Sequence, residues 1–312
     1  MTRDEPGRLP RTVWALGLVS LFMDASSESI HALLPLFLTV SLGASVATVG
    51  LIDGVAEAVG SITKMFSGYL SDRLGRRKPL VLLGYGLAAL SKPLFPLAGS
   101  AAAVFAARFA DRIGKGLRGA PRDALIADVT PPEMRGRAFG LRQALDTAGA
   151  FIGPLAAIAL MAAFADNMRL VFWIAAIPAL GAVLVVLLGV EDSDAPRSPQ
   201  GTRAPLRMRE LYRLSGEFWQ VIAVAAVFML ARFSEAFLIL KANATGLPLT
   251  LAPLVLVAMS AIYGAGSYPA GAWADRVPAR RLLIAGLGSL IAADLVLALA
   301  RSIGLTFVGI GL

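Results

Sequence analysis

The sequence predicts an all-α membrane protein, and three observations support this fold class. Of the 312 residues, 57% are hydrophobic and only 16% are charged, whereas a soluble domain is about 45–50% apolar and about 25% charged. Apolar runs of about 20 residues, the length of a helix that crosses a bilayer, follow one another along the chain. The basic residues gather in short segments between these runs, as in membrane proteins of defined orientation.

Composition also excludes several classes of function. The chain has no cysteine and one histidine, His31, so a disulfide framework, a thiol nucleophile and a multi-histidine metal site are excluded. The net charge is +8, but the bases lie between apolar segments and not on one soluble face, so nucleic acid is not an expected partner. No catalytic triad, phosphate loop or metal-ligand spacing is present. We therefore expect no enzyme activity, no cofactor and no metal.

Ten helices are predicted in order. The first, over residues 13–39, starts like a signal peptide, but Asp24 and Glu28 interrupt its apolar run and no cleavage pattern follows, so it is expected to be uncleaved. The others are predicted over residues 46–69, 79–98, 102–127, 138–162, 169–190, 217–241, 250–274 and 281–299, with a tenth beginning near residue 303. Because the chain ends at Leu312, partway through this tenth helix, we expect it to be a fragment.

A polar segment divides the chain. Residues 191–217 are rich in proline, serine and charge and cannot bury a core. The predicted organisation is an N-terminal six-helix bundle over 1–190, a linker over 191–216 and an incomplete C-terminal bundle over 217–312. If the N-terminus is cytoplasmic, most loop bases face the cytoplasm, which fits the positive-inside rule. This predicts a multi-pass protein of the inner (plasma) membrane whose N-terminus and linker are cytoplasmic.

Two landmarks recur in the second half of the chain. GYLSDRLGRRKP at residues 68–79 is matched by GAWADRVPARR at residues 271–281, which pairs Gly68, Asp72 and Arg73 with Gly271, Asp275 and Arg276. FMDASSE at residues 22–28 is similar to FMLARFSE at residues 228–235, which pairs Glu28 with Glu235. The order and spacing are nearly the same, so the two halves are predicted to be parallel repeats with a substrate site between them, midway through the membrane.

The first of these landmarks resembles motif A of the major facilitator superfamily, and its weaker copy resembles the second motif A of that family. The resemblance covers the whole chain. It implies the major facilitator fold, in which twelve helices form two six-helix bundles with pseudo-two-fold symmetry around a central cavity that works by alternating access. About nine and a half of the twelve helices are then present, so the chain is expected to be truncated at its C-terminus.

Motif A closes the cytoplasmic side in that family, which suggests a conformational switch here. We expect its glycines to allow close helix approach, Asp72 to pair with a positive helix end or a base of the other half, and its arginines to bind acids or lipid phosphates. The alternative is a basic loop that only sets topology, which leaves the glycines and Asp72 without a role. The residues of this predicted switch are Gly68, Asp72, Arg73, Gly75, Arg76, Arg77, Gly271, Asp275 and Arg276.

Charged residues inside the predicted helices are candidates for a transport cavity. Each costs at least about 2.5–3.5 kcal/mol at a helix centre, so each should face a cavity or a partner. Glu28 shares a helix face with Asp24 and His31 and is the favoured proton carrier because Glu235 is its counterpart. Static pairing with bases of the fourth helix is the alternative. The candidate cavity residues are Asp24, Glu28, His31, Asp53, Glu57, Arg108, Arg112, Lys115, Arg118, Arg232 and Glu235.

The fourth helix carries a stripe of bases. RIGKGLRGA at residues 112–120 is similar to the family's motif B, which is associated with proton-coupled members, and Arg112 stands at its arginine position. Lys115 stands where glutamine is usual, and Arg118 replaces a small residue. These departures indicate either an anionic substrate or additional salt bridges to the acids of the first two helices.

The fifth helix contains Gly149, Gly153 and Pro154, which resemble the antiporter motif C of the family, although alanines such as Ala157 replace its later glycines. Two glycines at i and i+4 form a groove for a neighbouring helix, and a proline bends the helix. Packing alone explains this pattern equally well.

Together, these features predict a secondary active transporter, coupled to protons, that exports a small organic or anionic solute. An uptake symporter is one alternative, and a non-transporting sensor or assembly factor with the same fold is another. The expected partners are the small-molecule substrate, protons as the coupling ion and the lipid bilayer, and the protein is expected to be a monomer.

Overall fold

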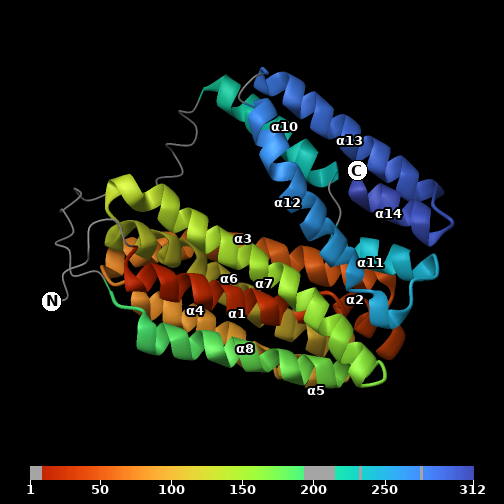
Figure 1. Cartoon of the computed structure of the whole chain (residues 1–312), viewed down its shortest axis with the longest axis horizontal. Helices are drawn as coiled ribbons and strands as arrows, with labels where there is room; N and C mark the ends of the chain where they lie inside the picture. The colour runs from red at the N-terminus through yellow and green to blue at the C-terminus, as the bar shows by residue number, and fades with distance from the viewer. Residues whose placement is uncertain (1–8, 193–214, 232–233, 275–276) are drawn as a thin grey trace.

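The computed structural model describes residues 9–192, 215–231, 234–274 and 277–312, and these form a bundle of helices (Figure 1). The elements of the first half are α1 (Arg11–His31), α2 (Leu34–Leu36), a π-helical turn η1 (Phe37–Ser41), α3 (Val46–Leu74), α4 (Lys78–Ser91), α5 (Leu94–Leu97), α6 (Ala101–Val129), η2 (Pro132–Met134), α7 (Arg135–Ala163) and α8 (Met168–Gly189). Those of the second half are α10 (Gly216–Ala231), α11 (Glu235–Ala244), η3 (Leu249–Leu251), α12 (Leu254–Ala274), α13 (Ala279–Leu299) and α14 (Ile303–Gly311).

These helices follow the spans predicted from the apolar runs, but three of the predicted helices are interrupted. The first ends at His31 and continues as α2 and the π-helical turn, next to Pro35. The third stops at Ser91 before Pro93 and resumes as α5. Proline lacks the N–H that a continuous helix requires, which explains both breaks. The seventh is divided into α10 and α11, and Ser234 caps the start of α11.

Six helices in the described part of the chain are long and apolar enough to cross a membrane. They comprise residues Val46–Leu74, Lys78–Leu97, Pro132–Ala163, Met168–Gly189, Leu249–Gly266 and Arg280–Leu299. α1 and α6 are not among these six. Both carry charged side chains within their length, and the candidate site lies along them.

α6 runs through the first half between α3 and α4, in direct backbone contact with both. A β-carbon added at Gly114 would lie 2.7 Å from the carbonyl oxygen of Gly84 in α4. One added at Gly116 would lie 2.6 Å from the carbonyl oxygen of Gly60 in α3. Neither position has room for a side chain, so these glycines set how deeply α6 enters the bundle. α1 is held on the other side by α7 and α8.

The two halves meet mainly toward one end of the molecule. There α11 contacts α2 and α3, while α12 and η3 contact α7. At this end the Thr250 hydroxyl donates a hydrogen bond of 2.6 Å to the Asp166 carboxylate in the α7–α8 turn. Toward the end that carries the start of α1 and the α3–α4 loop, the second half leans away from the first (Figure 1). The halves are therefore closed at one end and separated at the other.

Candidate functional site

Close packing of α7 on α1 positions Glu28. A β-carbon added at Gly149 would lie 2.5 Å from the carbonyl oxygen of Leu21, and one added at Gly153 would lie 2.7 Å from that of Ala25. The Ser29 hydroxyl of α1 also donates a hydrogen bond of 2.8 Å to the carbonyl oxygen of Gly153. The two glycines thus form a groove for α1, which places the acidic face of α1 against α7.

A cavity of about 940 Å³ lies between the halves, and we call it the main cavity. Its apolar lining includes Leu34, Leu38 and Ile52 of the first half and Ile239 and Leu256 of the second. Most of the candidate cavity residues meet here from four helices. The charged and titratable residues that line it are Glu28, His31, Asp53, Glu57, Arg108, Arg112, Lys115 and Glu235.

The bases of α6 are paired with acids of α3 in this cavity. Arg108 donates a hydrogen bond of 2.8 Å to Asp53, and Arg112 lies 2.5 Å from Glu57. Each arginine side chain is only 5% exposed. Even so, Nε and Nη1 of Arg108 and Nε of Arg112 have no hydrogen-bond acceptor within the described part of the chain. The ion pairs therefore leave buried guanidinium donors unused.

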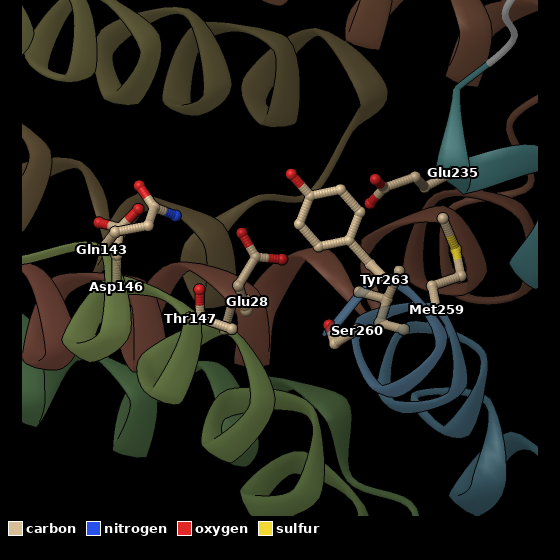
Figure 2. Close-up of a pocket in the computed structure, with 10 residues that line it drawn as sticks. Glu28, Gln143, Asp146, Thr147, Glu235, Met259, Ser260 and Tyr263 are labelled. Carbon is tan, nitrogen blue, oxygen red and sulfur yellow. The ribbon is translucent and has the colours of Figure 1, made fainter. Parts of the chain in front are cut away.

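A second, smaller cavity of about 370 Å³ adjoins the main cavity, and we call it the side cavity. Figure 2 shows side chains of α1, α7, α11 and α12 around it. It shares Glu28, Glu235 and Leu256 with the main cavity. Its lining is completed by Gln143, Asp146, Thr147 and Ala150 of α7 and by Met259, Ser260 and Tyr263 of α12. The polar residues of this lining other than the two shared glutamates were not among the candidates from sequence.

The side cavity is acidic. Its described lining contains three carboxylates and no lysine, arginine or histidine. Glu28 and Glu235, which are counterparts in the sequence repeat, come to it from opposite halves. Within the described residues, no three histidine, aspartate or glutamate side chains are grouped closely enough to hold a metal ion.

Two candidate cavity residues are placed elsewhere, and a third lies outside the described residues. Asp24 makes a side-chain hydrogen bond with Asp146 between α1 and α7 and does not line either cavity. Arg118 lies over the ring of Tyr85, 4.5 Å from its centroid, because the turn of α6 directs this residue toward α4. It is buried inside the first half and does not line either cavity. Arg232 lies outside the described residues.

A buried lysine was missed from sequence. Lys92, only 1% exposed, donates hydrogen bonds of 2.8 Å to Asp111 and 2.9 Å to the Ser27 hydroxyl. These three residues link α1, α6 and the segment after α4. Lys92 lies within an apolar stretch of the sequence, and Asp111 lies among the bases of the fourth predicted helix, so a buried pair was an available prediction. The pair does not line either cavity, so it stabilises the first half.

The α3–α4 loop contains the predicted switch. Gly75 ends α3 in the left-handed conformation, with a φ of 67°. This conformation explains why a glycine stands here, and close approach of a neighbouring helix is not needed to explain it. Arg77 donates hydrogen bonds of 2.6 Å to Asp72 and 3.2 Å to Asp128 of α6. Burial opposes the charge of Arg77, but these carboxylates raise its pKa. In this conformation Asp72 contacts a base of its own loop, and the expected pairing with a helix end or a base of the other half stays a prediction.

The remaining residues of the predicted switch are placed as follows. A β-carbon at Gly68 would approach Ala120 of α6 to 3.3 Å, which fits the close approach predicted there. Arg73 lies over the ring of Tyr69, 4.9 Å from its centroid. Arg76 lies in the loop itself, and Gly271 lies within α12. Asp275 and Arg276 are outside the described residues.

The segment after α8 also contacts this loop. Asp192 accepts hydrogen bonds from the backbone N–H groups of Arg77 at 3.0 Å and Lys78 at 3.3 Å. A carboxylate at this position caps the positive end of α4. Sequence reasoning assigned Asp192 to the linker and did not predict the cap.

Comparisons with known proteins agree with this architecture. Residues 16–312 match the sequence profile of the Major Facilitator Superfamily. The chain is 31% identical over 286 residues to an uncharacterized MFS-type transporter of Methanocaldococcus jannaschii, covering 89% of the chain and 70% of that protein. It is 32% identical to a probable 4-methylmuconolactone transporter of Cupriavidus pinatubonensis, over 62% of the chain and 45% of that protein.

A solved structure shows the same fold. The crystal structure of a bacterial homolog of the human lysosomal transporter Spinster, in an inward-facing and unoccupied conformation, superposes with a TM-score of 0.72. The two sequences are 21% identical, and the superposition includes 98% of this chain and 72% of that protein. With the family profile, the MFS-type relative and this fold in agreement, the chain belongs to the Major Facilitator Superfamily and is a multi-pass membrane protein.

Proposed function

We propose that this transporter is proton-coupled and exports a small organic or anionic solute by alternating access. The observation that carries the proposal is the main cavity, in which carboxylates of both halves and bases of the first half line a space of about 940 Å³. Intramembrane charges are costly and are retained chiefly along substrate and proton pathways. A substrate site between the halves is also where transporters built from repeats bind their solutes.

Glu28 is the coupling carboxylate in this proposal. It lines both cavities, as does Glu235, its counterpart in the other half. A proton gradient can bias the cycle only if the coupling group binds protons with different affinity in the two states. Glu28 lies on the boundary between the halves, so its surroundings change when the halves move.

The orientation and the switch are also part of the proposal. We place the N-terminus and the linker in the cytoplasm of a cell whose inner (plasma) membrane contains the protein as a monomer. The halves then meet at the outer end, and the described conformation is open to the cytoplasm. Closure of the cytoplasmic end would bring the α3–α4 loop toward the second half, where Asp72 could exchange Arg77 for a partner there.

The test is solute accumulation in proteoliposomes with an imposed pH gradient. A panel of organic anions, cations and zwitterions is offered, and the internal concentration of each is measured by mass spectrometry. A proton antiporter accumulates its solute in the more acidic compartment, because protons leave that compartment as the solute enters. Accumulation in the more alkaline compartment would indicate the symporter instead. No accumulation in either direction, from protein that is folded and inserted, would favour the non-transporting alternative.

A further inference from the structure

We propose that Asp24 and Asp146 share one proton, and that this carboxyl pair is a second protonation site of the transport cycle, linked to Glu28 by the side cavity. The proton of the pair does not depend on the identity of the solute, but its place in the transport cycle rests on the proposed function. Three observations support the site. They are the position of Asp24 against α7, the hydrogen bond between the two carboxyl groups, and the exposure of Asp146 to the side cavity.

The packing of α1 on α7 brings the two carboxyl groups together. A β-carbon added at Gly149 would lie 3.1 Å from the β-carbon of Asp24, so the aspartate leaves α1 where α7 has no side chain. Asp146 stands one helical turn before Gly149, on the same face of α7. The Asp24 side chain forms a side-chain hydrogen bond with it there. The contact is therefore fixed by the same close packing that positions Glu28.

A hydrogen bond between two carboxyl groups requires a proton. An ionised carboxylate has only acceptor oxygens, whereas a protonated carboxyl group has one O–H donor. Two carboxylates at hydrogen-bond distance also repel each other, and such a pair is stabilised when it holds one proton between its two groups. The pair of Asp24 and Asp146 therefore holds one proton and carries a single negative charge.

The ion pairs of Asp146 identify Asp24 as the protonated partner. The Asp146 carboxylate lies 3.4 Å from the guanidinium of Arg142 and 3.9 Å from that of Arg122. Both arginines also pair with Asp123, at 3.3 Å and 3.2 Å, so two bases already face two carboxylates. Asp24 forms no ion pair within the described part of the chain. Asp24 is thus the donor of the hydrogen bond, and the ionised Asp146 is its acceptor.

The other charges around the pair make its proton exchangeable. Lys115 and Arg118 of α6 act on Asp24 and favour its ionised form. Of the other helices packed on α1, α2 has no charged residue and α8 has one, Arg169, which donates hydrogen bonds to two backbone carbonyl groups at the start of that helix. Burial and the charge of Asp146 therefore hold the proton on Asp24, while the bases of α6 stabilise the carboxylate that its release creates.

The side cavity connects the pair to Glu28. The side chain of Asp146 is 26% exposed, and it lines this cavity of about 370 Å³ together with Glu28 (Figure 2). Most of the lining residues are polar, and the space is large enough for several water molecules. The charged or titratable neighbours at the far end of this route are His31, 3.5 Å from Glu28, and Glu235 of the second half.

Transfer along this route conserves charge. A proton that moves from Asp24 to Asp146, and through water to Glu28, leaves two carboxylates in the pair and a neutral glutamic acid. The total charge of the three residues is unchanged. Because α11 and α12 of the second half form the opposite wall of the side cavity, movement of the halves opens or closes the route.

Infrared spectroscopy of the protein in lipid tests the shared proton directly. A protonated carboxyl group absorbs apart from ionised carboxylates, and carbon-13 in the aspartate carboxyl groups distinguishes aspartate from glutamate. At neutral pH the wild-type protein should show a protonated aspartate band that is absent from Asp24→Asn. The asparagine amide can still donate a hydrogen bond to Asp146, so the variant keeps the contact between the helices. No such band in the wild-type protein, or the same band in Asp24→Asn, overturns the inference.

Two further variants test whether the proton belongs to the pair. Asp146→Asn should weaken the band by about twofold or more at the same pH, because the negative charge that keeps the proton on Asp24 is removed. Asp123→Asn is the matched control, since it removes a neighbouring acid of the same two arginines and should leave the band in place. An unchanged band in Asp146→Asn would show that Asp24 holds its proton alone and would overturn the pair.

The role in the cycle is measured with the solute that accumulates in the proteoliposome panel. Asp24→Asn should reduce accumulation driven by a pH gradient by at least about fivefold and leave counterflow of that solute, without a gradient, unchanged. Equal losses of accumulation and counterflow would indicate a structural role, and unchanged accumulation would make the pair a static contact. Either result overturns the role of the pair in the cycle.

The outcomes also separate this inference from the proposed function. If the wild-type protein and Asp24→Asn accumulate solute equally, the proton-coupled transporter stands and the role of the pair is wrong. If the shared proton is observed but no solute accumulates, the proton-binding pair stands and proton-coupled transport is wrong, together with the place of the pair in it. If the band is absent while solute accumulates with the pH gradient, only the pair is overturned.

Discussion

The Ser234 hydroxyl at the start of α11 donates a hydrogen bond to the Asp53 carboxylate of α3, across the two halves. The same carboxylate accepts a hydrogen bond of 2.8 Å from Arg108. Asp53 therefore connects a base of the main cavity to the second half. Any movement that separates α11 from α3 breaks the contact with Ser234 and leaves the pair with Arg108 intact, so the two contacts should contribute differently to stability and to transport.

Asp53→Asn should destabilise the protein by about 2–3 kcal/mol, because it removes the carboxylate that accepts a hydrogen bond from the buried guanidinium of Arg108 and leaves only Asp111, 4.0 Å away, as a charged partner. Ser234→Ala removes only the contact between the halves and should cost about 1 kcal/mol. Thermal unfolding in detergent measures both. Equal losses of stability would show that the ion pair with Arg108 contributes little.

Glu28→Gln should preserve folding and solute exchange but abolish accumulation driven by a pH gradient. Glutamine keeps the volume and much of the hydrogen bonding of glutamate, but it cannot gain or lose a proton. Counterflow of labelled solute, with no gradient, is the control for binding and movement. Accumulation at the wild-type level would make Glu28 a structural partner of His31 and the bases of α6, and Asp53 would then be the next carboxylate to test.

Asp72→Asn should shift the conformational equilibrium toward the state that is open at the α3–α4 loop, since one charge-dependent contact of the closed state is lost. Cysteines introduced into the main cavity of this cysteine-free chain should then be labelled faster from the cytoplasmic side. Lys78→Gln, at the start of α4, is the control, and it should leave labelling rates unchanged. Unchanged labelling and flux in Asp72→Asn would leave the loop with a role in topology only.

Gly153→Ala should destabilise the protein by about 1–3 kcal/mol. The added methyl group would lie 2.7 Å from the Ala25 carbonyl oxygen and 3.0 Å from the Glu28 β-carbon, so α1 and α7 would have to separate. Gly86→Ala is the matched control, because no heavy atom lies within 4 Å of its added methyl group. It should be neutral or slightly stabilising. If both variants unfold at the same temperature, the groove on α7 does not determine the position of α1.

The topology is tested by single cysteines at Ser198→Cys in the linker and Ser45→Cys between the first two predicted spanning helices. In intact cells an impermeant thiol reagent should label the second and not the first, since the loop bases place the linker inside. Labelling of Ser198→Cys from outside would reverse the orientation.

Much of the fold was predictable, because lipid requires long apolar segments in which every backbone group is paired. The helix interruptions near Pro35 and Pro93 were missed, although proline is a known breaker, because both lie in apolar runs that satisfy the length rule. The grouping of Glu28, Asp53, Glu57, Arg108 and Arg112 around one cavity followed from the cost of burying charge. That argument requires only that each charge has a partner or a cavity.

The same argument explains what was not predicted. The burial of Arg118 is offset by its contact with the ring of Tyr85, and that of Lys92 by its ion pair with Asp111. The free-energy cost of burying a charge does not tell whether the charged side chain faces a partner inside the bundle or a cavity. Residues without charge, such as Thr147 and Ser260, become part of the side cavity only because α7 and α12 of opposite halves meet there. The rotation of one helix against another is not encoded in hydropathy.

The glycine contacts of α6 have a mechanical consequence. Backbone lies on backbone at both Gly114 and Gly116, so α6 cannot slide or rotate against α3 or α4 without a collision of main-chain atoms. Helices packed this closely move together, so α3, α4 and α6 should move as one rigid unit. Binding of a solute or a proton in the cavity should then move the first half as a rigid body. The contacts that break are those between the halves, such as the hydrogen bond of Thr250 with Asp166.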